Sequence, residues 1–463
     1  MLNGRTGQST IEIMVALLIL TSALVGAVMV IFGGQSLVID SKEGNLALRL
    51  ARENLERTIV AAKNSYFSLA DSTVAEGEFT KTITVEEAGA NTVKVTSRVT
   101  WQTDPIRLQE QEVSMLVTDW YNVSQTGGDT GGGGTSGDWR NPRTLGSIDL
   151  GAGLSATDLD VMNRIVYMTA EASDSKKNDF VVVDATNGEA PFVTAGIDVG
   201  SSLNALDAAG NYAYVASRST SKQLKIIDIS NISAPVMVSS TTLPGVSGSG
   251  AVGQSIFYFG NRAFIGTQKA SGPEFHIMDV TNPLAPVSLG SLEINEDIYS
   301  IYVSGNVAYL GTSDDDEIRI LNVSNPAAIT ELGRYNILGS TEDSRVAHLV
   351  GNKLYVGRTK GGDHADHHEL AILDVSSSTT PVLLGSKNFI TDINDLRTRD
   401  GLVFLGTSDS NQEFQVWDAS DPQNIELWSF FNFPQVATAV DYENNLVYVA
   451  VRSNDALRII TSQ

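Results

Sequence analysis

The longest uninterrupted apolar segment of the chain lies near its start, at residues 13–32. These 20 residues carry no charge, and as a helix rising about 1.5 Å per residue they reach roughly 30 Å, the thickness of the hydrocarbon core of a bilayer. One acid, Glu12, precedes the segment, where burial in lipid costs on the order of 2.5–3.5 kcal/mol unless a partner neutralises it. The pattern therefore predicts a membrane-spanning helix that begins with a paired carboxylate.

A second helical pattern follows at about residues 36–65, where apolar residues recur every three or four positions between charged ones. They are Leu46, Leu50, Ala51, Leu55, Ile59 and Ala62. This spacing predicts an amphipathic helix with one face to bury. Three alternating runs at 78–86, 92–102 and 107–120 then predict antiparallel strands with one apolar face, on which the helix packs. Residues 123–137 are rich in glycine and predict a flexible coil.

The rest of the chain repeats a triplet of an aromatic, an aliphatic and a small residue, at intervals of about 44–50 residues. The seven triplets begin at Tyr167, Tyr214, Phe264, Tyr309, Tyr355, Phe404 and Tyr448. A turn pair, often Gly-Asn, precedes each triplet, and the strand after most of them ends in Asp. Seven similar units of four short strands predict a β-propeller, in which each blade buries its faces against its neighbours. We expect the recurring aspartates to accept backbone N–H bonds in turns.

The ends of the repeat region predict how the ring closes. The last copy stops after its third strand, at residues 456–461, so one strand is missing at the C-terminus. Residues 143–150 precede the first full copy and are similar to the fourth strand of the fifth copy at 381–387. We therefore expect residues 143–150 to supply the missing strand, because this pairing removes an exposed sheet edge.

Composition narrows the function without assigning it. The chain has 463 residues, a formal net charge of -23 and no cysteine. The negative charge argues against nucleic-acid binding, which needs a basic surface to neutralise phosphates. The lack of cysteine excludes disulfides and thiol nucleophiles.

The N-terminal residues resemble the type IV prepilin signal of bacterial pilins and secretion pseudopilins. The features shared with that signal are Arg5 in a short polar leader, Gly7, and Glu12 five residues after it. The resemblance implies that a membrane prepilin peptidase cleaves between Gly7 and Gln8 and that Gln8 is then N-methylated. It also implies that Glu12 compensates the terminal amine of a neighbouring subunit. Gln8 departs from the Phe or Met of most members. An ordinary membrane anchor or a secretory signal sequence is the alternative.

The repeats resemble the LVIVD-repeat propeller family. The matching strings are Leu-Lys-Ile-Ile-Asp at 224–228, Phe-His-Ile-Met-Asp at 275–279 and Leu-Ala-Ile-Leu-Asp at 370–374. This resemblance implies a fold and no particular activity.

One loop concentrates residues that could bind a metal. It contains Asp363, His364, Asp366, His367 and His368, which could bind zinc or nickel. Structural metal sites usually take ligands from two rigid elements, whereas this is one continuous loop, so adventitious binding is the favoured interpretation and no metal or other cofactor is expected. The acidic run 314–317 is interpreted in the same way, as a solvated turn instead of a calcium site.

The fold class that follows is an α+β pilin domain, with a long N-terminal helix and a small antiparallel sheet, followed by an all-β seven-bladed propeller. No catalytic constellation is evident, so we expect no enzyme. The expected function is a type IV pilin-like filament subunit that moves from the inner membrane to the cell surface, where its propeller binds an extracellular ligand or partner. A type II secretion pseudopilin and a membrane-anchored propeller enzyme are the alternatives. The expected parts are a leader at 1–7, a pilin domain at 8–121 with its helix at 8–65 and its β head at 78–120, a linker at 122–137 and the propeller at 138–463.

Overall fold

The computed structural model of the chain divides into two compact units, residues 1–119 and 120–463. It describes residues 43–58, 71–89, 92–104, 107–118, 135–151, 154–172, 177–313, 316–337, 342–361, 368–453 and 456–463. The residues that resemble a prepilin signal, including Gly7, Gln8 and Glu12, and the apolar segment 13–32 lie outside these residues.

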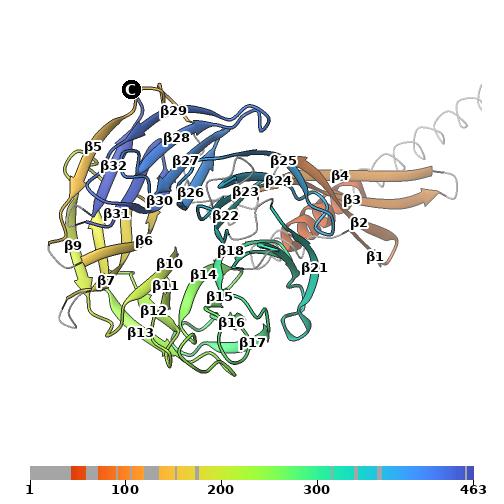
Figure 1. Cartoon of the computed structure of the whole chain (residues 1–463). Coiled ribbons are helices and arrows are strands. Elements are labelled where there is room, and N and C mark those ends of the chain that lie inside the picture. Colours follow the sequence, from red (N-terminus) through yellow and green to blue (C-terminus); the bar gives the residue numbers. More distant parts are fainter. Residues whose placement is uncertain are drawn as a thin grey trace, which may run out of the picture. The chain divides into compact units, whose positions relative to one another are not determined.

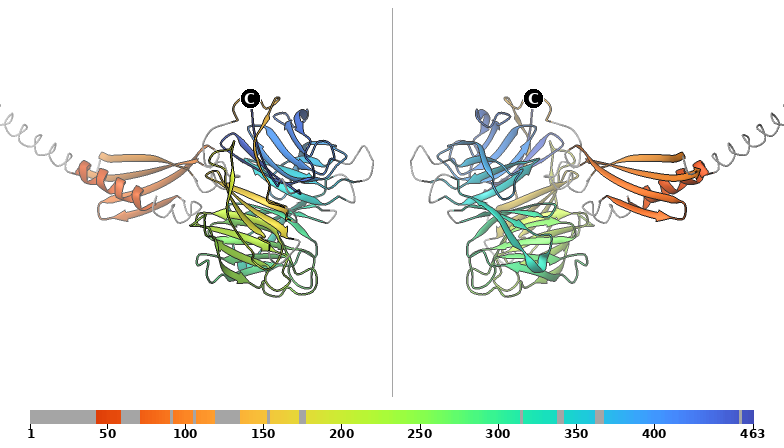
Figure 2. Two further views of the ribbon diagram at one scale, coloured as in Figure 1. Left: turned by 90° about the vertical axis from the view of Figure 1, so that its left-hand side faces the viewer. Right: turned by 90° about the vertical axis from the view of Figure 1, so that its right-hand side faces the viewer.

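The N-terminal unit places one helix, at 43–58, on a four-stranded antiparallel sheet (Figures 1 and 2). Ala47, Ala51 and Leu55 are buried and lie four residues apart, so they form a single stripe along the helix. This stripe packs on Trp101 and Ile83 of the sheet, together with nearby valines. The strands, in the order in which they pair, are β1 (Ser72–Glu76), β2 (Phe79–Gly89), β3 (Thr92–Asp104) and β4 (Arg107–Thr118).

The expected α+β class for the N-terminal part is wrong. Among the described residues the only α-helix is the one at 43–58, and nearly all the other regular elements of the chain are strands. Of the range 8–65, where we expected one long helix, the structure describes only residues 43–58, and these form a short helix whose buried stripe packs on the sheet. The sequence also missed β1, since all five of its residues are exposed and show no alternation. No described helix is both long and apolar enough to cross a membrane.

The second unit is a ring of seven antiparallel four-stranded sheets (Figure 1). This confirms the β-propeller predicted from the repeats. Each sheet is a blade, numbered here from the first complete copy. The strands of blades 1 to 3 are β6 (Leu154–Met162), β7 (Ile165–Ala172), β8 (Phe180–Asp184) and β9 (Phe192–Ile197); β10 (Leu203–Ala209), β11 (Tyr212–Ser217), β12 (Leu224–Asp228) and β13 (Val236–Thr241); and β14 (Gly253–Phe259), β15 (Arg262–Thr267), β16 (Phe275–Asp279) and β17 (Val287–Leu292).

Blades 4 to 6 continue the same pattern, and a short 3-10 helix, η2 (Pro326–Ala328), precedes the last strand of blade 4. Their strands are β18 (Ile298–Ser304), β19 (Val307–Thr312), β20 (Ile318–Asn322) and β21 (Thr330–Tyr335); β22 (Ser344–Val350), β23 (Lys353–Arg358), β24 (Leu370–Asp374) and β25 (Val382–Lys387); and β26 (Ile393–Arg399), β27 (Leu402–Thr407), β28 (Phe414–Asp418) and β29 (Glu426–Phe431).

Blade 7 is built from both ends of the ring, which confirms the predicted closure. Its strands are β30 (Ala437–Glu443), β31 (Leu446–Val451), β32 (Leu457–Thr461) and, from the other end, β5 (Arg143–Ile148). The antiparallel register pairs Leu457 with Ile148 and Thr461 with Arg143. Figure 1 shows β5 beside β32 near the marked C-terminus. β5 thus covers the edge that β32 would otherwise expose, and the hydrogen bonds between these two strands join the two ends of the ring.

Residues just before β5 strengthen this closure in a way that the sequence did not reveal. Trp139 is only 1% exposed and packs edge-on against Phe404 of blade 6, with ring centroids 4.8 Å apart. Its indole nitrogen donates to Asn445, at 3.2 Å. The backbone nitrogen of Asp138 donates to the carbonyl of Gln463, at 2.6 Å. We call residues 135–140 the clasp, because they connect the start of the ring to blades 6 and 7.

Turns form where the repeats predicted them. Gly260 and Asn261 have φ angles of 59° and 61°, as a tight hairpin between β14 and β15 requires. The residue that ends the third strand accepts a hydrogen bond from the backbone nitrogen two residues later, as expected, in the first six blades. These acceptors are Asp184, Asp228, Asp279, Asn322, Asp374 and Asp418.

Candidate functional site

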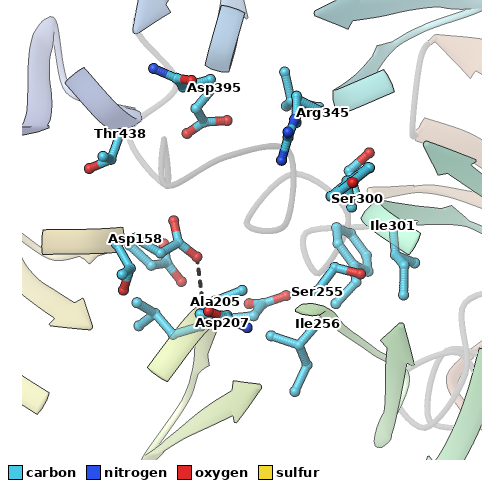
Figure 3. Close-up of a pocket in the computed structure, with 18 of the residues that line it drawn as sticks. Asp158, Ala205, Asp207, Ser255, Ile256, Ser300, Ile301, Arg345, Asp395 and Thr438 are labelled. Atoms are coloured by element: carbon cyan, nitrogen blue, oxygen red, sulfur yellow. Dashed lines mark hydrogen bonds between the residues drawn. The ribbon is translucent and has the colours of Figure 1, made fainter. Parts of the chain in front are cut away.

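A cavity of about 850 Å³ lies where the first strands of all seven blades meet. Its lining comes from β6, β10, β14, β18, β22, β26 and β30. Figure 3 shows side chains from several of these strands around an open centre, with Asp395 and Arg345 pointing into it. We call this cavity the channel.

The pairing of first and second strands gives an alignment of the channel residues. In every blade the pairing register between the first and second strands shifts once, near the start of the first strand. When the seven first strands are aligned on this shift, no gaps are needed. One equivalent position, the third residue after the shift, differs strongly from blade to blade. Its occupants from blade 1 to blade 7 are Asp160, Asp207, Phe257, Tyr302, His348, Arg397 and Asp441, and all but the last line the channel. We call this set the variable ring.

The aspartates of the variable ring hold neighbouring blades together. Asp160 accepts a hydrogen bond from the backbone nitrogen of Ala208 at 2.6 Å, and Asp207 accepts one from that of Tyr258 at 2.7 Å. In each case the donor belongs to the next blade. Within the described part of the chain, the hydrogen bonds of Asp160 and Asp207 use one carboxylate oxygen each, so these acids combine a structural role with an oxygen left for another donor.

Blades 6 and 7 carry an ion cluster on their side of the ring, in which one arginine pairs with two acids. Arg397 Nε lies 3.2 Å from a carboxylate oxygen of Asp441, and Arg397 Nη1 lies 3.4 Å from one of Asp395. The other oxygens of these two acids accept backbone N–H bonds from the adjacent blade. Because both acids and the arginine have partners, this cluster is best explained as structural.

Burial of so many acids changes their protonation. Burial is the largest cause that raises the pKa of Asp158 to about 7, and the charge of Asp395 adds to it. Burial likewise raises the pKa of Asp207 to about 6. The pKa of Asp160 is raised by burial and by the charges of Asp441 and Asp207. The channel wall thus holds more acids than Arg397 can neutralise, and some of them take up protons near neutral pH.

The side formed by blades 3 to 5 carries aromatic rings. The Phe257 and Tyr302 ring centroids are 5.0 Å apart, and those of Tyr302 and His348 are 5.6 Å apart. Burial lowers the pKa of His348 to about 3, and the charge of Arg397 lowers it further, so the imidazole is neutral. Its Nδ1 atom contacts the Thr398 hydroxyl at 3.0 Å, whereas Nε2 is buried and has no partner among the described residues.

Most of the sequence-predicted site residues cannot be placed. Asp363, His364, Asp366 and His367 lie outside the described residues. His368 is described, and its Nδ1 atom contacts the Ser386 hydroxyl at 2.5 Å. Within the described part of the chain, no three side chains of His, Cys, Asp or Glu converge as metal ligands do.

The interpretation of 314–317 as a solvated acidic turn is wrong for Glu317, whose side chain is only 1% exposed. Glu317 pairs with the fully buried Arg358, which also lies 3.2 Å from Glu342. Burial raises the pKa of Glu317 to about 7 even though Arg358 is adjacent. The run of acids at 314–317 does not by itself distinguish Glu317 from its neighbours.

Glu317 belongs to a recurring set that sequence reasoning missed. In six blades the residue just before the third strand is a buried acid or amide that accepts the backbone N–H of the residue 20 positions later. The set is Asp179, Gln223, Glu274, Glu317, Glu369 and Glu413. Aligning the seven copies would have revealed it, because the position always lies one residue before the repeated strand.

Comparisons with known proteins support the propeller. The LVIVD repeat family matches residues 204–242, 297–337 and 363–388. No curated protein shows significant sequence similarity to the chain.

Two solved structures match with a TM-score of 0.50, which at their low identity indicates a shared fold only. One is a chain of the mitotic checkpoint complex, with 11% identity, covering 70% of this chain and 95% of that one. The other is a protein from Lactobacillus plantarum, with 12% identity, covering 78% and 97%. The WD40 propeller domain of Doa1 matches with 13% identity, a TM-score of 0.49, and coverage of 70% and 97%.

Proposed function

We propose that the chain is a binding protein that displays its propeller outside the cell and holds a ligand, or part of a partner, in the channel. The channel carries this proposal. Its volume of about 850 Å³ falls within the range of roughly 300–1,000 Å³ that is typical of ligand sites. Polar and aromatic groups converge on it from all seven blades, and the variable ring breaks the sevenfold repetition that architecture alone would favour.

Binding is a better explanation of the channel than catalysis. The acids of the variable ring are each fixed by a backbone N–H of the next blade, and Arg397 is fixed by two acids. A general acid or base needs to exchange its proton with a substrate, whereas these groups act as rigid hydrogen-bonding walls. The fixed geometry of such walls suits recognition.

Obstruction of the channel tests this proposal. Gln254 lines the channel, so Gln254→Trp should narrow it. The control, Ser288→Trp, introduces the same Trp side chain on the exposed outer strand β17. Thermal melts would be recorded with a library of small amines, acids, sugars and short peptides. A ligand that binds only the folded state stabilises that state. At least one class of compound should therefore raise the melting temperatures of the wild type and of Ser288→Trp by several degrees. The melting temperature of Gln254→Trp should rise much less. Equal responses of all three proteins would place the binding elsewhere and contradict the proposal.

We propose that display follows the prepilin route. In this proposal the peptidase cuts between Gly7 and Gln8, Gln8 is methylated, and segment 13–32 holds the chain in the inner membrane until it joins other subunits of a surface filament. The resemblance of residues 5–12 and the charge-free segment after them support it. Cleavage would place a positive terminus one helical turn from Glu12, and a neighbouring subunit could then pair with that acid.

The mature N-terminus tests the display route. Gly7→Glu should block cleavage, because the peptidase must seat the residue before the cut, and intact-mass measurement should then find the leader retained. Glu12→Ala should still be cleaved but enter filaments poorly, because the paired acid is gone. A mature chain that starts at Gln8 in the Gly7→Glu variant would rule out prepilin processing.

A further inference from the structure

We infer that the channel binds an organic ammonium ion, held between the carboxylates of Asp160 and Asp207 and the aromatic side chains of Phe257, Tyr302 and His348. This inference names the ligand class for the channel, and it rests on the proposed function. We call these five residues the open wall. They occupy equivalent positions on blades 1 to 5, so they form one continuous arc of the variable ring.

The charges along the channel favour a cation. Among the described residues, no arginine or lysine lies within ion-pair distance of Asp160 or Asp207, and Arg397 pairs with Asp395 and Asp441 instead. Two other arginines line the channel, Arg345 and Arg452. Arg345 stacks on Tyr299 with its guanidinium carbon 4.2 Å from the ring centroid, and it also lies 3.7 Å from Asp343. Arg452 lies 3.5 Å from Glu171. An anion would therefore meet uncompensated carboxylates, whereas a cation would supply their missing partner.

A second, independent observation points to a ligand on the same arc. The His348 side chain is only 4% exposed, it lines the channel, and its Nε2 atom has no hydrogen-bond partner among the described residues. Because Thr398 can either donate to or accept from Nδ1, Nε2 is an acceptor in one tautomer of His348 and a donor in the other. The Ser300 hydroxyl, which also lines the channel on blade 4, likewise lacks a described partner (Figure 3). Buried polar atoms are normally satisfied, so a polar ligand in the channel is the missing partner of these two side chains.

The aromatic half of the open wall distinguishes an organic cation from a metal ion. Phe257 and Tyr302 pack as a tilted pair at 5.0 Å, and a cation near the face of such rings is attracted by their quadrupoles. A metal ion needs several ligands within one coordination sphere. Here each acid is fixed by the backbone of a different neighbouring blade, and no described cluster of three potential ligands converges. A cavity of about 850 Å³ also suits an organic molecule better than an ion.

Titration calorimetry on the full chain tests the ligand class. The probes are benzyltrimethylammonium and benzylamine, with benzyl alcohol and benzoate as the neutral and anionic analogues of the same size. The two ammonium probes should bind, and the other two should bind at least about tenfold more weakly, because only a cation neutralises the acids.

Two variants locate the binding. Asp207→Asn keeps an oxygen to accept the Tyr258 N–H while removing the charge, and it should weaken both ammonium probes about tenfold or more. Phe257→Leu keeps an apolar side chain but removes the ring, and it should weaken benzyltrimethylammonium about threefold to tenfold. Asp149→Asn, on the exposed surface, makes the same change in net charge as Asp207→Asn and should leave binding unchanged.

The outcomes separate this inference from the proposed function. If benzoate or benzyl alcohol binds, if neither ammonium probe binds, and if Asp207→Asn does not weaken that binding, the ligand class is overturned. The channel would then still be a binding site. Ammonium binding that is equally reduced by Asp149→Asn and Asp207→Asn would show attraction to the acidic surface and overturn the inference. Failure of all four probes to bind would overturn it too, whereas the obstruction experiment with Gln254→Trp judges the proposed function by itself.

Discussion

Deletion of residues 138–150 is expected to unfold the propeller or make it aggregate. The deletion removes β5, which leaves β32 as an open sheet edge, and it removes Trp139 from the apolar cluster shared by blades 6 and 7. Loss of a buried Trp side chain alone costs about 3–5 kcal/mol, and a native domain has only about 5–15 kcal/mol of stability. Thermal melting of chains that begin at residue 120, with and without the deletion, measures the effect.

Deletion of residues 122–134 is the matched control, because it shortens the chain by the same 13 residues and leaves the clasp and β5 in place. It should melt as the parent does. Trp139→Ala should fall between the two, and Trp139→Phe should lose less than Trp139→Ala, since a smaller ring still fills part of the site. Equal melting temperatures for the two deletions would mean that β5 does not close the ring in solution.

Arg358→Met is expected to destabilise the propeller by about 3–5 kcal/mol at pH 8, because it leaves two buried carboxylates without their counter-ion. The side chains of Arg358, Glu317 and Glu342 are at most 1% exposed. Denaturant unfolding of the wild type and the variant, each at pH 8 and pH 5, measures the effect.

The loss should shrink at pH 5, and the sign follows from the pKa of Glu317. Its pKa in the folded protein is already about 7, above the ordinary value of 4.5, so folding favours the protonated form. Removing Arg358 raises that pKa further. Near pH 5 the carboxyl is largely neutral in the folded protein and its burial costs little. As the pH rises from the ordinary value of 4.5 toward the raised folded value, the unfolded chain ionises while the folded protein stays protonated, so the stability of the variant falls.

A surface ion pair provides the control for Arg358. Arg334 contacts Glu331 and Asp316, and its side chain is 44% exposed. Arg334→Met should change stability by no more than about 1 kcal/mol at either pH, because exposed pairs contribute little. A loss from Arg358→Met that is equally small, or that is larger at pH 5 than at pH 8, would contradict the argument from buried charge.

The sequence determined the features that repeat or that act locally. Seven aromatic triplets predicted the propeller, Gly260 and Asn261 predicted a hairpin turn, and the shortfall at the C-terminus predicted that β5 completes blade 7. Each of these depends on spacing along the chain, which a sequence displays directly. One failure was also local, because the exposed β1 has no alternation to detect.

The candidate site depended on the tertiary structure. The variable ring takes one residue from each of seven strands about 50 positions apart, and nothing in the local pattern around Asp207, Phe257 or His348 marks them as neighbours of one channel. Closure of the ring brings them together. Burial then raises the pKa of the acids and leaves the His348 Nε2 atom with no partner in the described part of the chain. Protonation, pairing and burial depend on distances across the ring, which are set only when all seven blades have packed. The sequence therefore determined the architecture of the propeller, and the tertiary structure decided which of its many polar side chains form a site.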